Sequence, residues 1–131
     1  GIDISHTAIK KAKKIFPELR FTKADLLKKR PLVNEYFDLV VVKDVIWYIC
    51  QDIGKFLQNA IDMVRDQGLF YVSQAFPKTD KWVGQEIVDS PYRLKEILLS
   101  YTEPLHYCVE WDWNVNGRPL VHYLGRVKER V

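Results

Sequence analysis

The side chain best suited to chemistry near the start of this chain is Asp3, which stands between two isoleucines and is followed at once by a helical pattern. This setting is typical of the second strand of a nucleotide-binding βαβ unit, where the carboxylate lies against a ribose. A carboxylate can accept both ribose hydroxyl protons at once. Asp3 could instead cap the following helix, where its charge would be favourable. Its position and the order of the later strands favour the ribose role.

A second group of candidate residues follows the apolar run at residues 37–42. Asp44 could act as a general base, although a cap for a short helical turn is the favoured interpretation. Tyr48 is the other candidate for a catalytic group, and neither is assigned. Trp47 and Tyr48 could shape a substrate pocket, since aromatic side chains often line such pockets, or they could pack against the next helix. Trp82 could belong to a mobile lid over the same pocket.

Composition excludes several other classes of function. The three histidines and two cysteines lack metal-ligand spacing, so no metal site is expected, and a reducing, cytoplasmic setting is the simplest interpretation. The net charge of +3 comes from scattered basic residues without interleaved aromatics, which argues against a nucleic-acid surface. No apolar run approaches the roughly 20 residues needed to cross a membrane, so no membrane partner is expected.

The elements that must position these residues alternate along the chain. Helices are predicted over residues 5–16, 53–64 and 90–101, with Gly68 as a C-cap glycine after the second. Strands are predicted over 19–24, 37–42, 69–75, 106–115 and 120–127, and residues 27–36 as a short exposed helix or loop. The run at 37–42 does not alternate, which predicts burial on both faces. Asn116-Gly117 predicts a closing hairpin.

This order predicts an α/β fold with a mostly parallel sheet and a C-terminal antiparallel hairpin. In order and interval, five segments of the chain resemble class I S-adenosylmethionine-dependent methyltransferases, which have a Rossmann-like three-layer fold. The segments are Gly-Ile-Asp-Ile-Ser at residues 1–5, Lys-Ala-Asp-Leu at 23–26, Phe-Asp-Leu-Val-Val-Val-Lys-Asp-Val at 37–45, Gly-Leu-Phe-Tyr-Val at 68–72 and the hairpin. The hairpin counts against an NAD-dependent oxidoreductase, which would continue with further βα units.

The resemblance implies a role for several residues. Asp3 would bind the ribose hydroxyls of S-adenosylmethionine, and Ile4 would pack on the adenine. Asp25, with Leu26 beside it, would receive the adenine amino group, although an aspartate after a strand is also a common turn or cap residue. Lys43 and Asp44 would line the methionine end of the cofactor. The substrate mouth would include Trp47, Tyr48 and Trp82.

The family's first strand and glycine-rich turn do not match any segment of this chain, so residues 1–131 are expected to form a single, partial methyltransferase domain. The missing strand would lie between those ending at Asp3 and Lys43, which predicts a gap or an open edge beside residues 39–42. The expected function is methyl transfer to a small-molecule acceptor by in-line displacement. The alternative is a non-catalytic methyltransferase-like fragment that binds or dimerises, as a homodimer through the open sheet edge.

Overall fold

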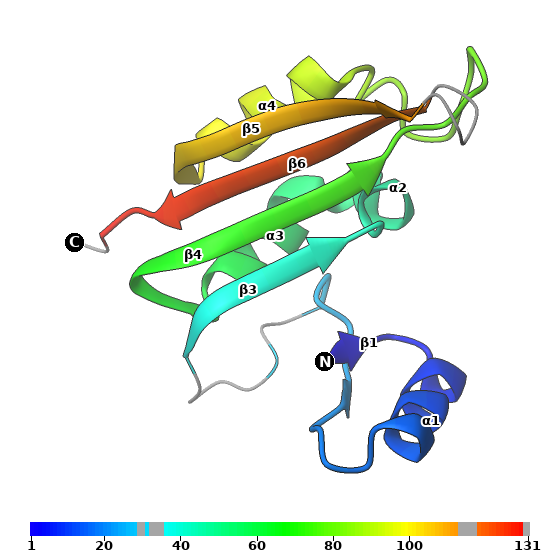
Figure 1. Ribbon diagram of the computed structural model, residues 1–131, viewed down its shortest axis with the longest axis vertical. Helices are drawn as coiled ribbons and strands as arrows, with labels where there is room; N and C mark the ends of the chain where they lie inside the picture. Colours follow the sequence, from blue (N-terminus) through cyan, green and yellow to red (C-terminus); the bar gives the residue numbers. More distant parts are fainter. Residues whose placement is uncertain (29–30, 32–35, 113–117, 130–131) are drawn as a thin grey trace.

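Strands and helices alternate along most of the chain before it closes in an antiparallel pair of strands (Figure 1). The computed structural model describes residues 1–28, 31, 36–112 and 118–129. The elements in order are β1 (Ile2–Asp3), α1 (His6–Ile15), β2 (Thr22–Lys23), β3 (Phe37–Lys43), α2 (Ile46–Ile49), the 3₁₀ turn η1 (Cys50–Asp52), α3 (Ile53–Ile61), β4 (Val64–Ala75), α4 (Pro91–Leu99), β5 (Thr102–Asp112) and β6 (Arg118–Val127).

The described strands form two sheets. β1 and β2 pair in parallel, with Asp3 opposite Lys23. The larger sheet has the order β3-β4-β6-β5, in which β3 and β4 are parallel and β6 runs antiparallel to both of its neighbours. The predicted combination of parallel strands with a closing antiparallel pair is therefore confirmed.

Helices α1 and α4 begin where their capping residues predict. The Ser5 Oγ accepts a hydrogen bond from the Ala8 N–H at 3.2 Å, and the helix ends before Pro17, which cannot continue it. The Ser90 Oγ accepts from the Arg93 N–H at 3.1 Å, with Pro91 in the first turn. Each cap satisfies one backbone donor that a helix start leaves open.

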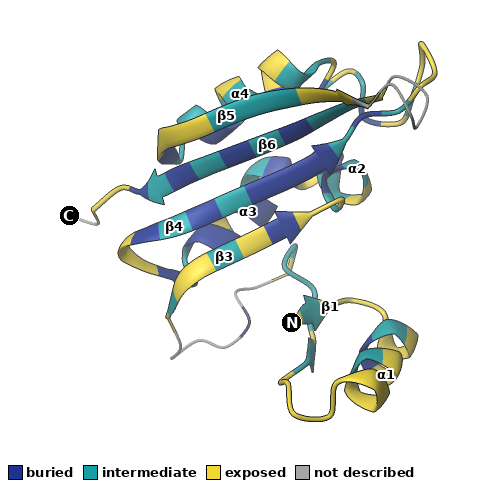
Figure 2. Cartoon of the chain, viewed as in Figure 1, coloured by how far each residue is buried: buried dark blue, intermediate teal, exposed yellow. Residues whose placement is uncertain are grey.

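The core lies between the larger sheet and a layer of helices. α2, α3 and α4 lie behind this sheet in Figure 1, and α1 packs on the β1–β2 pair. Because side chains alternate along a strand, one face of β4 and β6 points at the helices. Phe70 and Tyr123 are fully buried and belong to one core cluster with Leu57 and Leu94. Figure 2 shows buried residues recurring along β4 and β6. No described helix lies in front of the other face.

Strand β3 lies at an edge of the larger sheet, and burial on both of its faces was a wrong prediction. Val42, on the helix side, is 5% exposed, whereas Leu39 and Val41 on the opposite face are 48% and 54% exposed. Among the described residues β3 pairs only with β4, and nothing covers its outer face. The predicted open edge beside residues 39–42 is confirmed.

The segment after α3 also differs from the prediction. The helix ends at Ile61, and Val64 already belongs to β4, so Gly68 is not a helix C-cap. Gly68 lies in β4, where the register with β3 shifts. A Cβ there would lie 2.7 Å from the Val64 Cγ1 and 2.9 Å from the Arg65 carbonyl oxygen, so only glycine allows this close approach.

Other differences concern the extent of elements. β2 has two residues instead of the predicted six, and β5 begins at Thr102, four residues before the prediction. Most of the predicted segment at residues 27–36, and the turn at residues 116–117, fall outside the described residues. Within the described part of the chain, no helix has the length and apolar character to span a membrane.

Candidate functional site

A cavity of about 830 Å³ lies where the two sheets separate, between β1 and β3. One part of its lining follows β3 from Phe37 to Val42. Another part is formed by the carboxyl ends of β1, β2 and β3 and the residues that follow them, and Phe56 and Ala60 of α3 add to the lining. Ligands of open α/β sheets bind at such strand ends. The cavity has the size of a small-molecule site, for which about 300–1,000 Å³ is usual.

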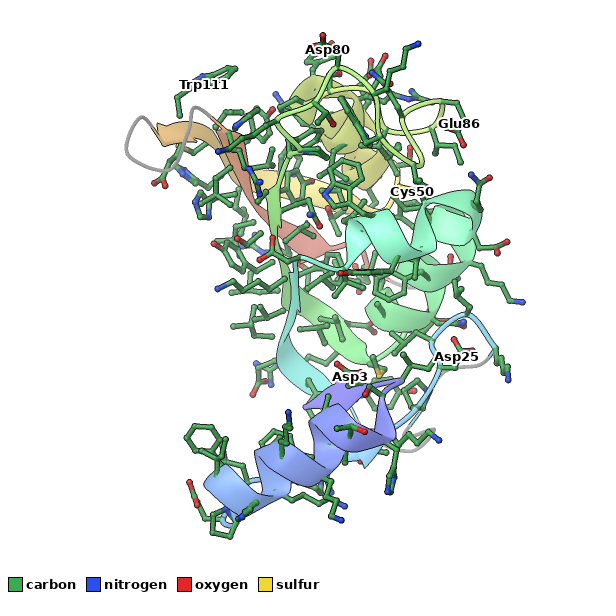
Figure 3. The ribbon with its side chains drawn as sticks, turned by 90° about the vertical axis from the view of Figure 1, so that its right-hand side faces the viewer. Asp3, Asp25, Cys50, Asp80, Glu86 and Trp111 are labelled. Atoms are coloured by element: carbon green, nitrogen blue, oxygen red, sulfur yellow. The ribbon has the colours of Figure 1, made fainter. Side chains whose placement is uncertain are left out.

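All six residues predicted to contact a cofactor line this cavity: Asp3, Ile4, Asp25, Leu26, Lys43 and Asp44. The parallel pairing of β1 with β2 brings the first four together, and the Ala24 N–H donates to the Asp3 carbonyl oxygen at 3.0 Å. Asp3 and Asp25 accordingly lie at neighbouring strand ends in Figure 3. The sequence thus predicted which side chains gather here, while their contacts with a ligand stay predictions.

The end of β1 presents a carboxylate and an apolar side chain. The Asp3 Oδ1 accepts a hydrogen bond from the Ser5 N–H at 2.7 Å, which fixes the carboxylate at the start of the turn into α1. Ser5 itself caps the helix, so the capping alternative for Asp3 is wrong. A carboxylate has about four acceptor positions, and this bond occupies one of them. Ile4, beside it, lines the same cavity and is 64% exposed, so its apolar side chain is accessible to a ligand.

The end of β2 is held to the main body of the protein. The Asp25 Oδ1 accepts from the Leu27 N–H at 2.9 Å, so this half-buried carboxylate also stabilises a turn. The Asn59 side chain of α3 donates to the Leu26 carbonyl oxygen, and Leu26 and Leu27 pack against the core. These contacts fix the β1–β2 pair across the cavity from β3.

At the end of β3, Asp44 links two strand ends, and the expectation that it caps a helical turn is wrong. Its Oδ1 accepts from the Ala75 N–H at 3.0 Å, at the end of β4, and its own N–H donates to the Ser73 carbonyl oxygen at 2.9 Å. Its φ of 51° lies in the left-handed region, which aspartate tolerates better than most residues. The residue before α2 is Val45, which makes no side-chain cap.

The sequence did not predict Gln74, which is 1% exposed and positions α2 on the sheet. The Gln74 Oε1 accepts from the Ile46 N–H at 3.0 Å, and the Gln74 Nε2 donates to the Ala75 carbonyl oxygen at 3.0 Å. The Trp47 Nε1 donates to the same carbonyl at 2.8 Å. The only signal in the sequence was a polar side chain within an apolar strand run.

A second cavity, of about 580 Å³, adjoins the first. Asp44 and Tyr48 line both cavities, and Tyr48 is 86% exposed. Trp47 lines the second cavity together with Phe76, whose ring centroid is 4.9 Å away in an edge-to-face contact. Trp82 lines neither cavity but packs behind Trp47, with ring centroids 5.9 Å apart.

Two other kinds of reactive centre, a nucleophilic thiol and a metal site, find no support in the described residues. Burial raises the pKa of the Cys50 thiol, and the nearby charge of Glu86 raises it further, so the thiolate that would be a nucleophile is disfavoured. No group of three or more histidine, cysteine or acidic side chains in the described ranges could hold a metal ion.

Residues 1–72 match a family described as the methyltransferase domain. No curated protein sequence matches the chain at a significant level.

Among solved structures, the chain is similar to the N-methyltransferase NodS from Bradyrhizobium japonicum, with a TM-score of 0.78 and 20% identity over 98% of this chain and 72% of NodS. A NodS complex with S-adenosyl-L-homocysteine gives a TM-score of 0.73 and 16% identity over 98% of this chain and 65% of that one. The cyclase SpnF gives 0.77 and 11% over 99% of this chain and 66% of SpnF.

The chain thus spans less than two thirds of two of these three solved chains. At these identities the structural similarity concerns the fold alone, and a cyclase among the similar structures illustrates that one fold can serve different reactions. The similarity confirms the predicted Rossmann-like α/β class. The family match covers more than half of the chain. This chain therefore belongs to the family of methyltransferase domains.

Proposed function

We propose that this chain binds S-adenosylmethionine at the strand-end side of the larger cavity and takes part in methyl transfer to a small-molecule acceptor. The observation that carries the proposal is the convergence on one cavity of the six residues for which the resemblance to methyltransferases implies cofactor contacts. Of the similar structures, NodS has been solved with S-adenosyl-L-homocysteine, the product that remains after the methyl group leaves.

The residues at the strand ends fit the parts of this cofactor. Asp3 would accept hydrogen bonds from the ribose hydroxyls, and the exposed Ile4 would cover one face of the adenine. Asp25 would accept from the adenine amino group, with Leu26 beside it. Lys43 and Asp44 would lie towards the methionine part. When bound, the cofactor supplies a methyl group on a positively charged sulfur, and that methyl group is transferred to the acceptor.

The protein's own contribution is to position the acceptor and to exclude water. Asp44 and Tyr48 line both cavities, so they stand where an acceptor and a cofactor would meet. The Asp44 Oδ1 accepts from the Ala75 N–H, and the other carboxylate oxygen, Oδ2, has no hydrogen-bond partner among the described residues. It would take the proton that a hydroxyl or amine acceptor loses. Tyr48 is the second candidate for this role.

Calorimetric titration with S-adenosylhomocysteine tests the cofactor site, with NAD as the competing ligand class. The Asp3→Asn variant removes the charge but keeps an oxygen for the Ser5 N–H. A hydrogen bond to a charged group contributes about 1.5–3 kcal/mol, so binding should weaken roughly 10- to 100-fold. Asp52→Asn is the matched control, because Asp52 is exposed and lines neither cavity.

Three results would contradict this proposal. If the unsubstituted chain does not bind S-adenosylhomocysteine, it has no complete cofactor site. If Asp3→Asn and Asp52→Asn bind equally well, the ribose assignment is wrong. Preferential binding of NAD would move the chain to another class of nucleotide site.

The open edge of β3 supports a second candidate function, a binding or dimerising module. An edge strand presents unpaired backbone donors and acceptors that a second copy could pair with. Sedimentation over a range of concentrations would detect the homodimer. Val41→Lys should weaken it, since Val41 is 54% exposed on this strand, whereas Val83→Lys, at a position 81% exposed on the far connection, should not. A chain that stays monomeric at every concentration would contradict this candidate.

A further inference from the structure

We propose that the second cavity selects a methyl acceptor that carries an anionic group, and that Lys78 and Arg118 bind this group. The inference rests on the proposed methyl transfer and goes further by naming the substrate class. Three charged residues line the cavity: Asp44, Lys78 and Arg118. Two cations against one carboxylate leave this wall with a net positive charge.

The two cations come from separate parts of the chain. Lys78 follows β4 in the connection to α4, and Arg118 begins β6. β4 and β6 are antiparallel neighbours, and the Phe76 N–H donates to the Pro119 carbonyl oxygen at 2.9 Å, which fixes these two segments side by side. Among the described side chains neither cation forms an ion pair.

The negative charge and the two positive charges differ in which cavities they line. Asp44 lines both cavities, whereas Lys78 and Arg118 line only the second. An acceptor would therefore place its reacting atom beside Asp44 and its anionic group beside Lys78 and Arg118. Trp47 and Phe76, whose rings are in edge-to-face contact, add apolar lining to the same cavity. This arrangement fits a molecule with a nucleophile, an apolar or aromatic middle and a carboxylate or phosphate.

Three small probes test the anion site on the whole chain: phenylacetate, phenyl phosphate and the neutral phenylacetamide. Trp47 provides the readout, because its indole N–H donates to the Ala75 carbonyl oxygen at this cavity and gives one NMR signal, assigned with Trp47→Phe. Both anions should shift this signal with dissociation constants about tenfold below that of the amide.

Variants locate the binding. Lys78→Gln and Arg118→Gln should each weaken the anions about two- to fivefold, and the double variant about tenfold, since exposed charge pairs contribute little each. Binding of phenylacetamide should not change. Lys81→Gln is the matched control, because Lys81 is an exposed cation of the same connection that does not line the cavity.

The proposal is overturned if no probe shifts the Trp47 signal, if the amide binds as tightly as the anions, or if Lys81→Gln weakens them as much as the cavity variants do. Titration with S-adenosylhomocysteine separates this result from the proposed function. Lys78→Gln and Arg118→Gln should leave that affinity unchanged, since neither residue lines the larger cavity. Anion binding without S-adenosylhomocysteine binding would refute the cofactor site alone.

Discussion

The backbone of Asp44 predicts an order of stability for three substitutions at one position. Its φ of 51° is in the left-handed region, and its Oδ1 accepts from the Ala75 N–H at 3.0 Å. Asparagine keeps both the tolerance of this conformation and an oxygen for the Ala75 N–H. Asp44→Asn should therefore change the free energy of unfolding by less than about 0.5 kcal/mol.

Asp44→Gly and Asp44→Ala separate the two contributions. Glycine adopts the left-handed conformation freely but loses the side-chain hydrogen bond, which contributes about 0.5–1.5 kcal/mol because it is exposed to solvent. Alanine loses the same bond and in addition bears the left-handed strain of roughly 1–2 kcal/mol, part of which is offset because glycine is more flexible when unfolded. Asp44→Ala should thus be less stable than Asp44→Gly by about 1 kcal/mol.

Urea denaturation followed by circular dichroism measures these differences. With a slope of about 2 kcal/mol/M, the midpoint of Asp44→Ala should lie about 0.5 M below that of Asp44→Gly and about 1 M below that of the unsubstituted chain. Equal stability of the glycine and alanine variants would refute the backbone argument. An asparagine variant as unstable as the glycine variant would refute the hydrogen bond.

The same series tests whether the Asp44 carboxylate takes a proton. With an acceptor that supports turnover, Asp44→Asn should lower kcat about 100-fold or more while stability is kept, because general-base catalysis contributes roughly 10²–10⁴-fold. Unchanged kcat would transfer the role to another group, with Tyr48→Phe as the next variant to measure.

Three further predictions concern parts of the chain outside the cavities. Burial raises the pKa of the Tyr123 hydroxyl above its ordinary value of 10.0, so the folded state holds this proton at a higher pH than the unfolded state does. The free energy of unfolding should therefore be unchanged below about pH 10 and should fall as the pH rises through the folded pKa. Tyr123→Phe removes the 2.8 Å hydrogen bond to Thr102 and should lower the free energy of unfolding by about 1 kcal/mol at neutral pH. In urea denaturation it should also make the loss of stability at high pH less steep, and an equally steep loss would contradict the assignment of that loss to Tyr123. A thiol reagent should label the half-buried Cys108 rapidly and the buried Cys50 slowly, with the rapid phase lost in Cys108→Ser. Gln67, with a φ of 61°, should become more stable by up to about 1 kcal/mol when replaced by glycine, as thermal unfolding would show.

Local chemistry explains which elements could be predicted from the sequence. Ser5 and Ser90-Pro91 begin helices through bonds to residues three positions away, so short sequence windows contain the whole signal. The gathering of Asp3, Asp25 and Asp44 was also predictable, because the carboxyl ends of parallel strands meet at one edge of a sheet.

The features that the sequence did not predict depend on distant partners. Burial of the outer face of β3 requires another element to cover it, and no property of Leu39 or Val41 provides one. Gln74 caps α2 from a strand 28 residues further along, which no local pattern indicates. Gly68 was predicted to end a helix, whereas it lies at a strand irregularity. Both features require glycine, so the residue type alone does not distinguish them.

The open edge of β3 also determines how this chain behaves at high concentration. The run from Leu39 to Val42 is apolar, mostly β-branched and free of proline and glycine, and β3 as a whole has the seven-residue length of segments that stack into amyloid. Asp38 and Lys43 flank it as charged gatekeepers. Lys43→Val should therefore shorten the lag before thioflavin-binding fibrils form. The strand whose end lines the cavity is thus also the segment whose charges protect the chain from fibril formation.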